Sequence, residues 1–141
     1  MKKKTHKLSV DIHSEFHVWG ISSHENDYRL SWAINTNLNL NLSKSSNLEI
    51  VNTKTQEIQE FNVFMYNDED SQCRYDLVSN RCHDGFLLPE YKNVDYFLII
   101  NGEIAEYELK IMFSRLKQIE IITLAFPISD LTSKSLGKLH F

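Results

Sequence analysis

The longest uninterrupted hydrophobic run in the chain covers residues 96–100, where five apolar or aromatic residues follow one another. Pro89 stands upstream of the run, and Asn101 with Gly102 closes it. A short apolar run that is bounded by turn residues and rich in aromatic and β-branched side chains is typical of a strand buried on both faces. We therefore expect this strand in the interior of a sheet.

Shorter stretches of alternating or β-branched residues predict the other strands. These stretches are residues 16–21, 48–51, 58–66, 73–78 and 119–126. The second and third should pair with each other, and the third and fourth should form a hairpin towards one edge of the sheet. The last is apolar at alternating and intervening positions, which predicts an interior strand that ends before Pro127.

A first helix is predicted to begin at the Ser22-Ser23-His24-Glu25 sequence, which matches a capping box. It should end near Asn39, because asparagine tolerates the left-handed conformation of a helix C-cap. Apolar residues recur in this segment with helical spacing and predict a core-facing surface. They are Leu30, Ala33, Ile34 and Leu38, flanked by Tyr28 and Trp32.

A second helix is predicted after Gly102, with acidic residues near its start and basic residues near its end, as the helix dipole favours. Its apolar stripe consists of Ala105, Leu109, Met112, Phe113 and Leu116. The order of elements predicts an α+β domain over residues 1–141, with one largely antiparallel sheet of five to six strands and both helices on one face. Residues 129–141 should pack on the domain as a loop or short strand, and the basic residues 1–7 should be frayed.

The face of the sheet opposite the helices is expected to be strongly aromatic. We place Trp19, Phe64, Tyr66 and Phe97 on it, together with Leu124 and Phe126. Because monomers rarely expose a large contiguous apolar patch, this face needs a cover. The cover is either residues 79–93 with the C-terminal tail, or a second subunit. The candidate interface for that subunit consists of Trp19, Phe64, Tyr66 and Phe97.

Composition narrows the classes of partner and compartment. Among the 141 residues, the formal net charge is −4 and the pI is near 5.8, which disfavours nucleic acid as a partner. No apolar segment approaches the length of a membrane span or follows the basic N-terminus as in a signal peptide. Cys73 and Cys82 have neither redox-motif nor zinc-knuckle spacing. We therefore expect a cytoplasmic protein with two independent thiols.

Residues 88–96 read Leu-Pro-Glu-Tyr-Lys-Asn-Val-Asp-Tyr. This stretch resembles the motif of the IPExxxVDY family, small proteins of bacteria related to Bacteroides and Flavobacterium, with leucine in place of the first isoleucine. The layout of the Gly20 to Ser23 turn and of residues 28–30 is also similar. The resemblance implies an intracellular bacterial protein and no particular activity.

The two carboxylates of this stretch, Glu90 and Asp95, are the best candidates for chemistry. With Tyr96 and Arg29 they could surround a cleft that binds a small ligand or carries acid/base catalysis. The alternative, which we favour, is structural, because buried carboxylates are usually paired. Glu90 would then accept backbone N–H groups after the proline. Asp95 would cap a segment or pair with a basic residue, such as Arg29, Arg74 or Lys92.

No cofactor or metal motif accompanies these residues. His13, His17 and His24 lack the spacing of a zinc site, and the four glycines form no phosphate-binding loop. The sequence thus favours a non-enzymatic interaction or assembly module, which would form a homodimer or a complex with another protein. The alternatives are the ligand-binding or enzymatic cleft, and weak binding of single-stranded RNA on strand aromatics such as Phe64 and Tyr66.

Overall fold

A computed structural model describes residues 16–141, so the basic cluster at residues 1–7 and His13 lie outside the described part. The strands are β1 (Phe16–Ser22), β2 (Ser43–Lys44), β3 (Leu48–Val51), β4 (Ile58–Phe61), β5 (Val63–Asp68), β6 (Cys73–Ser79), β7 (Arg81–Cys82), β8 (Gly85–Phe86), β9 (Tyr96–Asn101) and β10 (Leu124–Ile128). The helices are α2 (Asp27–Leu38), α3 (Glu106–Lys117) and α4 (Ser133–Leu139), and Pro89–Tyr91 form the 3-10 helix η1.

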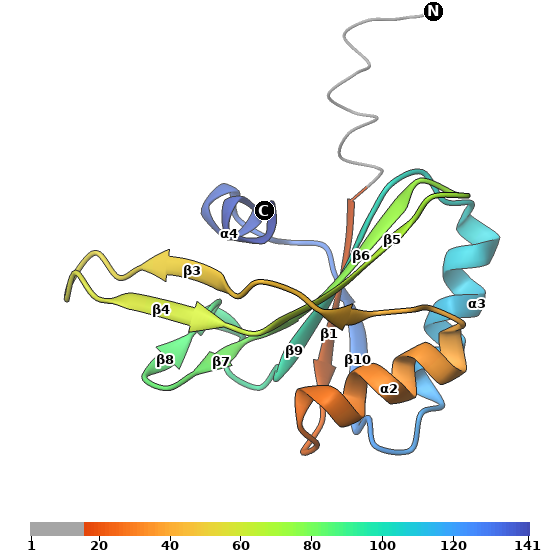
Figure 1. Ribbon diagram of the computed structural model, residues 1–141, viewed down its shortest axis with the longest axis horizontal. Helices are drawn as coiled ribbons and strands as arrows, with labels where there is room; N and C mark the ends of the chain where they lie inside the picture. The colour runs from red at the N-terminus through yellow and green to blue at the C-terminus, as the bar shows by residue number, and fades with distance from the viewer. Residues whose placement is uncertain (1–15) are drawn as a thin grey trace, which may run out of the picture.

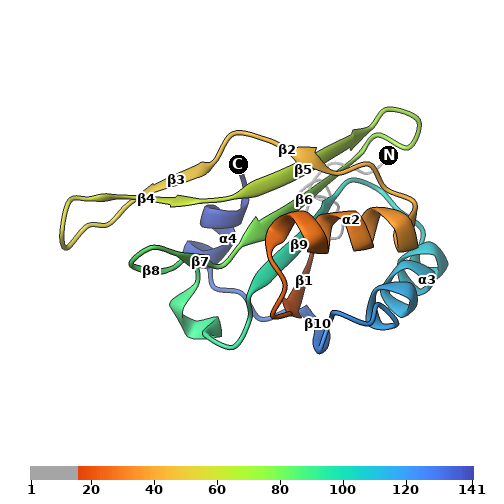
Figure 2. The ribbon, with the colours of Figure 1, turned by 60° about the horizontal axis from the view of Figure 1, so that its bottom comes forward.

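The main sheet has six antiparallel strands in the order β10-β1-β9-β6-β5-β2. Strand β9, the predicted central strand, lies between β1 and β6. Strands β3 and β4 pair as predicted, but they form a separate arm that projects from the sheet (Figure 1). Helices α2 and α3 lie together on one face (Figure 2). The predicted α+β class and its antiparallel sheet are confirmed.

The sheet separates two hydrophobic cores, because side chains alternate between its faces. In β9, Leu98 and Ile100 enter the core beneath α2 and α3, whereas Phe97 and Ile99 enter the core on the opposite side. The chain itself covers that second side through four buried residues. They are Leu87, Leu88, Val94 and Leu139. Of the two covers that we expected, the structure shows the intramolecular one.

The prediction that the aromatic residues share the face opposite the helices is wrong for Trp19, Phe64 and Tyr66. Trp19 and Phe64 are buried on the helix side, and Phe97 is fully buried on the opposite side. Tyr66 is partly buried against the helix-side core and stacks on Tyr75 with ring centroids 5.9 Å apart. Aromatic content identified these residues as interior but not the face on which each lies. The chain itself therefore covers Trp19, Phe64 and Phe97, and it partly covers Tyr66.

Two predicted element boundaries are also corrected. Residues 119–126 do not form an interior strand: β10 starts at Leu124, lies at the sheet edge and contains Pro127, which pairs with Trp19. Proline is tolerated there because one side of an edge strand needs no ladder hydrogen bond. The tail contains α4 instead of a loop or strand, and its N-cap Thr132 accepts a bond from the Ser135 N–H at 3.1 Å.

Helix α2 begins later than the capping-box prediction. Its N-cap is Asn26, whose side chain accepts the Arg29 N–H at 2.9 Å. Ser22 instead ends β1, and the Ser23 hydroxyl donates to the Ile121 carbonyl at 2.7 Å. The C-terminal prediction is confirmed, because Asn39 adopts the left-handed conformation with φ 58°.

Candidate functional site

The loop that carries the motif is organised by Asn80, a residue that the sequence did not single out. Its side chain is completely buried. The amide nitrogen donates to the carbonyls of Tyr91 and Val94, both at 2.8 Å, and the amide oxygen accepts the Leu88 N–H at 2.8 Å. One buried amide therefore satisfies three backbone groups and fixes the path of residues 88–94. The signal available in the sequence was an asparagine just after a predicted strand.

Asp95 lies just before the start of β9 and joins three segments. Its carboxylate accepts the Ser23 N–H at 2.9 Å and the Arg81 Nε–H at 2.7 Å. Arg81 also donates to the Lys92 carbonyl at 3.2 Å. Asp95 thus pairs with a basic residue, as predicted, but that residue is Arg81 and not one of the three candidates named from the sequence. Of those, Arg74 pairs with Asp76 at 2.9 Å.

Glu90 lies on η1 and contacts α4. Its carboxylate accepts a hydrogen bond from the Ser135 hydroxyl. This bond lowers the pKa of Glu90 below its usual range, and the ammonium groups of Lys138 and Lys134 lower it further. Its own backbone N–H also contributes, in keeping with the expected backbone donor. Glu90 therefore ties the motif loop to the C-terminal helix.

The depressed pKa of Glu90 predicts an acid-dependent loss of stability. A carboxylate whose folded-state pKa lies below its ordinary value of 4.5 stabilises the fold above that pH. The contribution is lost as the pH falls through the folded-state pKa. We expect chemical unfolding between pH 6 and 3, roughly the carboxylate titration range, to show a weaker acid dependence in Glu90→Gln and in Ser135→Ala. Unchanged profiles in both variants would contradict the assigned bond.

The four candidate ligand residues do not converge. Asp95 and Tyr96 line one cleft of about 560 Å³, whereas Glu90 faces α4 and Arg29 lies on the outside of α2 in an ion pair with Glu25. The Tyr96 hydroxyl donates to the Glu25 carbonyl at 2.8 Å, and desolvation above all raises its pKa to about 12.

The polar groups of that cleft bind one another. The Ser22 hydroxyl donates to the Asn93 carbonyl at 2.6 Å, and the Thr123 hydroxyl donates to the Ser22 carbonyl at 2.9 Å. Together with the Asp95–Arg81 pair, these bonds connect the last residue of β1 and the residues just before β9 to the turn before β10. The cleft thus supports an architectural role for the second half of the motif.

A different surface exposes large side chains. On the outside of α2, Tyr28 is 65% exposed and Trp32 is 68% exposed. The sequence placed both beside the core-facing stripe, which is wrong. Trp32 stands two residues from both Leu30 and Ile34, about 200° around the helix axis, so it points away from the core. The spacing of Trp32 from Leu30 and Ile34 was therefore the signal in the sequence that Trp32 points outward.

Trp32 stands between two shallow hollows. One, of about 550 Å³, is lined by Asn26, Tyr28, Arg29 and Trp32. The other, of about 430 Å³, lies between α2 and the turn after α3 and is lined by Arg29, Trp32, Ala33, Asn37, Ile119, Glu120 and Ile121. We call these residues together the α2 face. Tyr28 is braced within it, because its ring meets Phe64 edge-on with centroids 5.2 Å apart.

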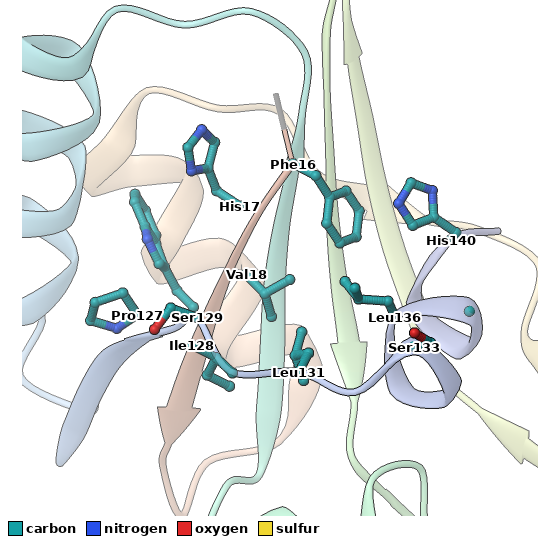
Figure 3. Close-up of a pocket in the computed structure, with 12 residues that line it drawn as sticks. Phe16, His17, Val18, Pro127, Ile128, Ser129, Leu131, Ser133, Leu136 and His140 are labelled. Atoms are coloured by element: carbon teal, nitrogen blue, oxygen red, sulfur yellow. The ribbon is translucent and has the colours of Figure 1, made fainter. Parts of the chain in front are cut away.

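A larger groove of about 640 Å³ lies on the other side of the sheet, between β1, β10 and α4. Figure 3 shows Phe16 and His140 side by side at its α4 wall, and their rings stack with centroids 4.0 Å apart. Its remaining lining is mostly apolar. It includes Val18, Ile128, Leu131, Leu136 and Gly137.

Comparison with protein-family models, with curated proteins and with solved structures finds no match to this chain. Within residues 16–141, no three His, Cys, Asp or Glu side chains are grouped so that they could hold a metal ion. None of the helices in that same range has the length and apolar character needed to cross a bilayer.

Proposed function

We propose that this protein is a non-enzymatic interaction module that binds a protein partner through the α2 face. The observation that carries the proposal is the pair of large aromatic side chains, Tyr28 and Trp32, left about two-thirds exposed on one helix. Tryptophan, tyrosine and arginine are the residues that most often dominate the energy of protein interfaces. Arg29 lies between the two aromatics along the helix.

The α2 face is also ordered before binding. Helix α2 has an Asn26 side-chain cap at its start and a left-handed Asn39 cap at its end, and Tyr28 is held against Phe64. A preordered surface loses less conformational entropy when it binds. The edges of the sheet offer less for strand addition, because β2 has two residues and β10 contains Pro127. These features favour recognition by the helix over recognition by the sheet.

The proposal predicts that Trp32→Glu strongly weakens partner binding. Loss of a central interface tryptophan typically costs at least ~2 kcal/mol, or about thirtyfold in Kd. Proteins cross-linked to the wild-type chain would be identified by mass spectrometry, purified and titrated by calorimetry against wild type and variant.

Ile111→Glu on α3 is the matched control, because it adds the same charge at another exposed apolar residue. It should bind like wild type. Equal affinity of wild type and Trp32→Glu for every recovered protein would refute the proposal.

The assignment to a family and compartment stays a proposal as well. The match of residues 88–96 to the IPExxxVDY motif supports membership of that family. The two free thiols, Cys73 buried and Cys82 half-buried, are compatible with a reducing cytoplasm. Fractionation of cells that express the tagged protein tests the compartment.

A second candidate function is binding of a small apolar molecule in the groove beside α4. Its volume of about 640 Å³ and its apolar lining support this function, since ligand sites typically have both properties. A substitution at Gly137 can test this function, because a Cβ atom added there would have no neighbouring atom within 4 Å.

We expect Gly137→Leu to fold with stability raised by about 0.5–1 kcal/mol, as removal of a helix glycine allows. The added side chain should also fill the groove. Titration with the apolar dye anilinonaphthalene sulfonate, displaced by decanoate, should show binding to wild type and several-fold weaker binding to the variant. Equal dye binding by the two proteins would exclude the groove as the site.

A further inference from the structure

We propose that the partner of the α2 face is a second copy of this chain, bound across a two-fold axis. This inference rests on the proposed function and names its partner. In a two-fold dimer the same patch of both copies is in contact, so every projection must find its recess on the same surface. The α2 face satisfies that requirement in shape and in charge.

The shape argument starts from Trp32 and the hollow beside it. The indole projects from α2, and the adjoining recess of about 430 Å³ has an apolar floor. That floor includes Ala33, Ile119 and Ile121, of which the first two are buried and the third is half-buried. Because projection and recess lie side by side, two copies related by a two-fold axis can each insert Trp32 into the recess of the other. Each insertion removes an exposed indole from water, a favourable change.

The charge argument rests on Arg29 and Glu120, which line the same hollow with opposite sign. A two-fold axis beside the hollow brings Arg29 of one copy towards Glu120 of the other, and the reverse contact follows by symmetry. Arg29 already pairs with Glu25 on its own helix, Nε to Oε1 at 3.3 Å. A guanidinium group has five N–H donors, so it can hold Glu25 and a second carboxylate together. The patch is therefore self-complementary in charge.

The test is sedimentation equilibrium of the full chain over a concentration range of about 5–500 µM, since dimer formation follows mass action. We expect a reversible dimer at the upper concentrations. Trp32→Glu should weaken association at least tenfold, and so should each of the single variants Arg29→Glu and Glu120→Arg. The double variant Arg29→Glu/Glu120→Arg should restore dimerisation, because it exchanges the two charges across the axis. Arg115→Glu on α3 is the control and should behave like wild type.

A wild-type chain that stays monomeric up to the highest concentration would overturn the inference. A dimer that is insensitive to Trp32→Glu would do so too, as would a double variant that associates no better than its single parents. Circular dichroism of each variant establishes that its fold is retained. If the wild-type chain is monomeric but still binds another protein through Trp32, the homodimer fails and the proposed function survives. If Trp32→Glu changes neither interaction, both fail.

Discussion

Replacement of Asn80 by alanine is expected to destabilise the protein by about 3–5 kcal/mol, because three backbone groups lose their partner inside the protein. The carbonyls of Tyr91 and Val94 and the N–H of Leu88 all bind this one amide. Water cannot replace it without opening the loop, since Asn80 is completely buried. Urea unfolding followed by circular dichroism measures the change.

Asn47→Ala is the matched control for Asn80→Ala. Asn47 is exposed and binds Glu60 and Lys44 at the surface, so its loss should cost within about 0.5 kcal/mol. The two residue changes are chemically identical, and only the buried one should matter. Equal small effects from both would mean that Asn80 does not organise the motif loop.

Asp95→Ala is expected to lower the free energy of unfolding by about 2–4 kcal/mol, the second-largest effect that we predict. The change leaves the backbone N–H of the buried Ser23 without its acceptor and removes the carboxylate that holds Arg81. A hydrogen bond to a charged group contributes about 1.5–3 kcal/mol. Of the two bonds to this carboxylate, the one from Arg81 contributes less, because that side chain is 52% exposed. Thermal and urea unfolding provide the measurement.

Asp95→Asn separates the two contributions of this residue. The amide keeps an oxygen for the Ser23 N–H but loses the charge opposite Arg81. The free energy of unfolding of Asp95→Asn should therefore lie between that of the wild type and that of Asp95→Ala. A double-mutant cycle with Arg81→Ala isolates the ion pair. Wild-type stability in Asp95→Ala would contradict an architectural role and return this carboxylate to the candidates for ligand binding.

Local signals in the sequence predicted the parts of the fold that depend on local patterns. Strand β9 followed from an uninterrupted apolar run, α3 from its amphipathic stripe and charge order, and the end of α2 from Asn39. Each of these signals is contained within a few residues, so no knowledge of distant contacts was needed.

Features that depend on distant contacts were missed. Asn80 matters because the chain returns to it between Leu88 and Val94. Asp95 binds Arg81 because the pairing of β6 with β9 places the residues after β6 beside the start of β9. Helix α4 has a weak helical sequence that contains Gly137, and the packing of Leu139 in the second core supports it. Tertiary packing routinely overrides local propensity in such segments.

The candidate ligand residues lie apart for a physical reason. Carboxylates near a buried strand attract functional interpretation, but here Glu90 and Asp95 each bind a partner from another segment of the same chain. The surface that we propose for binding lies on α2, where the exposed indole of Trp32 was taken for part of the core-facing side. Counting its angle from Leu30 and Ile34 would have placed it outside.

The most direct test of this account compares Trp32→Glu with Glu90→Gln in one calorimetric experiment. Each variant would be titrated with the wild-type partner, or diluted from high concentration if the partner is a second copy. The account predicts that Trp32→Glu loses the heat of association, whereas Glu90→Gln keeps the wild-type Kd within about twofold, as expected for a residue outside the interface. Association that is retained in Trp32→Glu and lost in Glu90→Gln would contradict it and place the binding site at the motif.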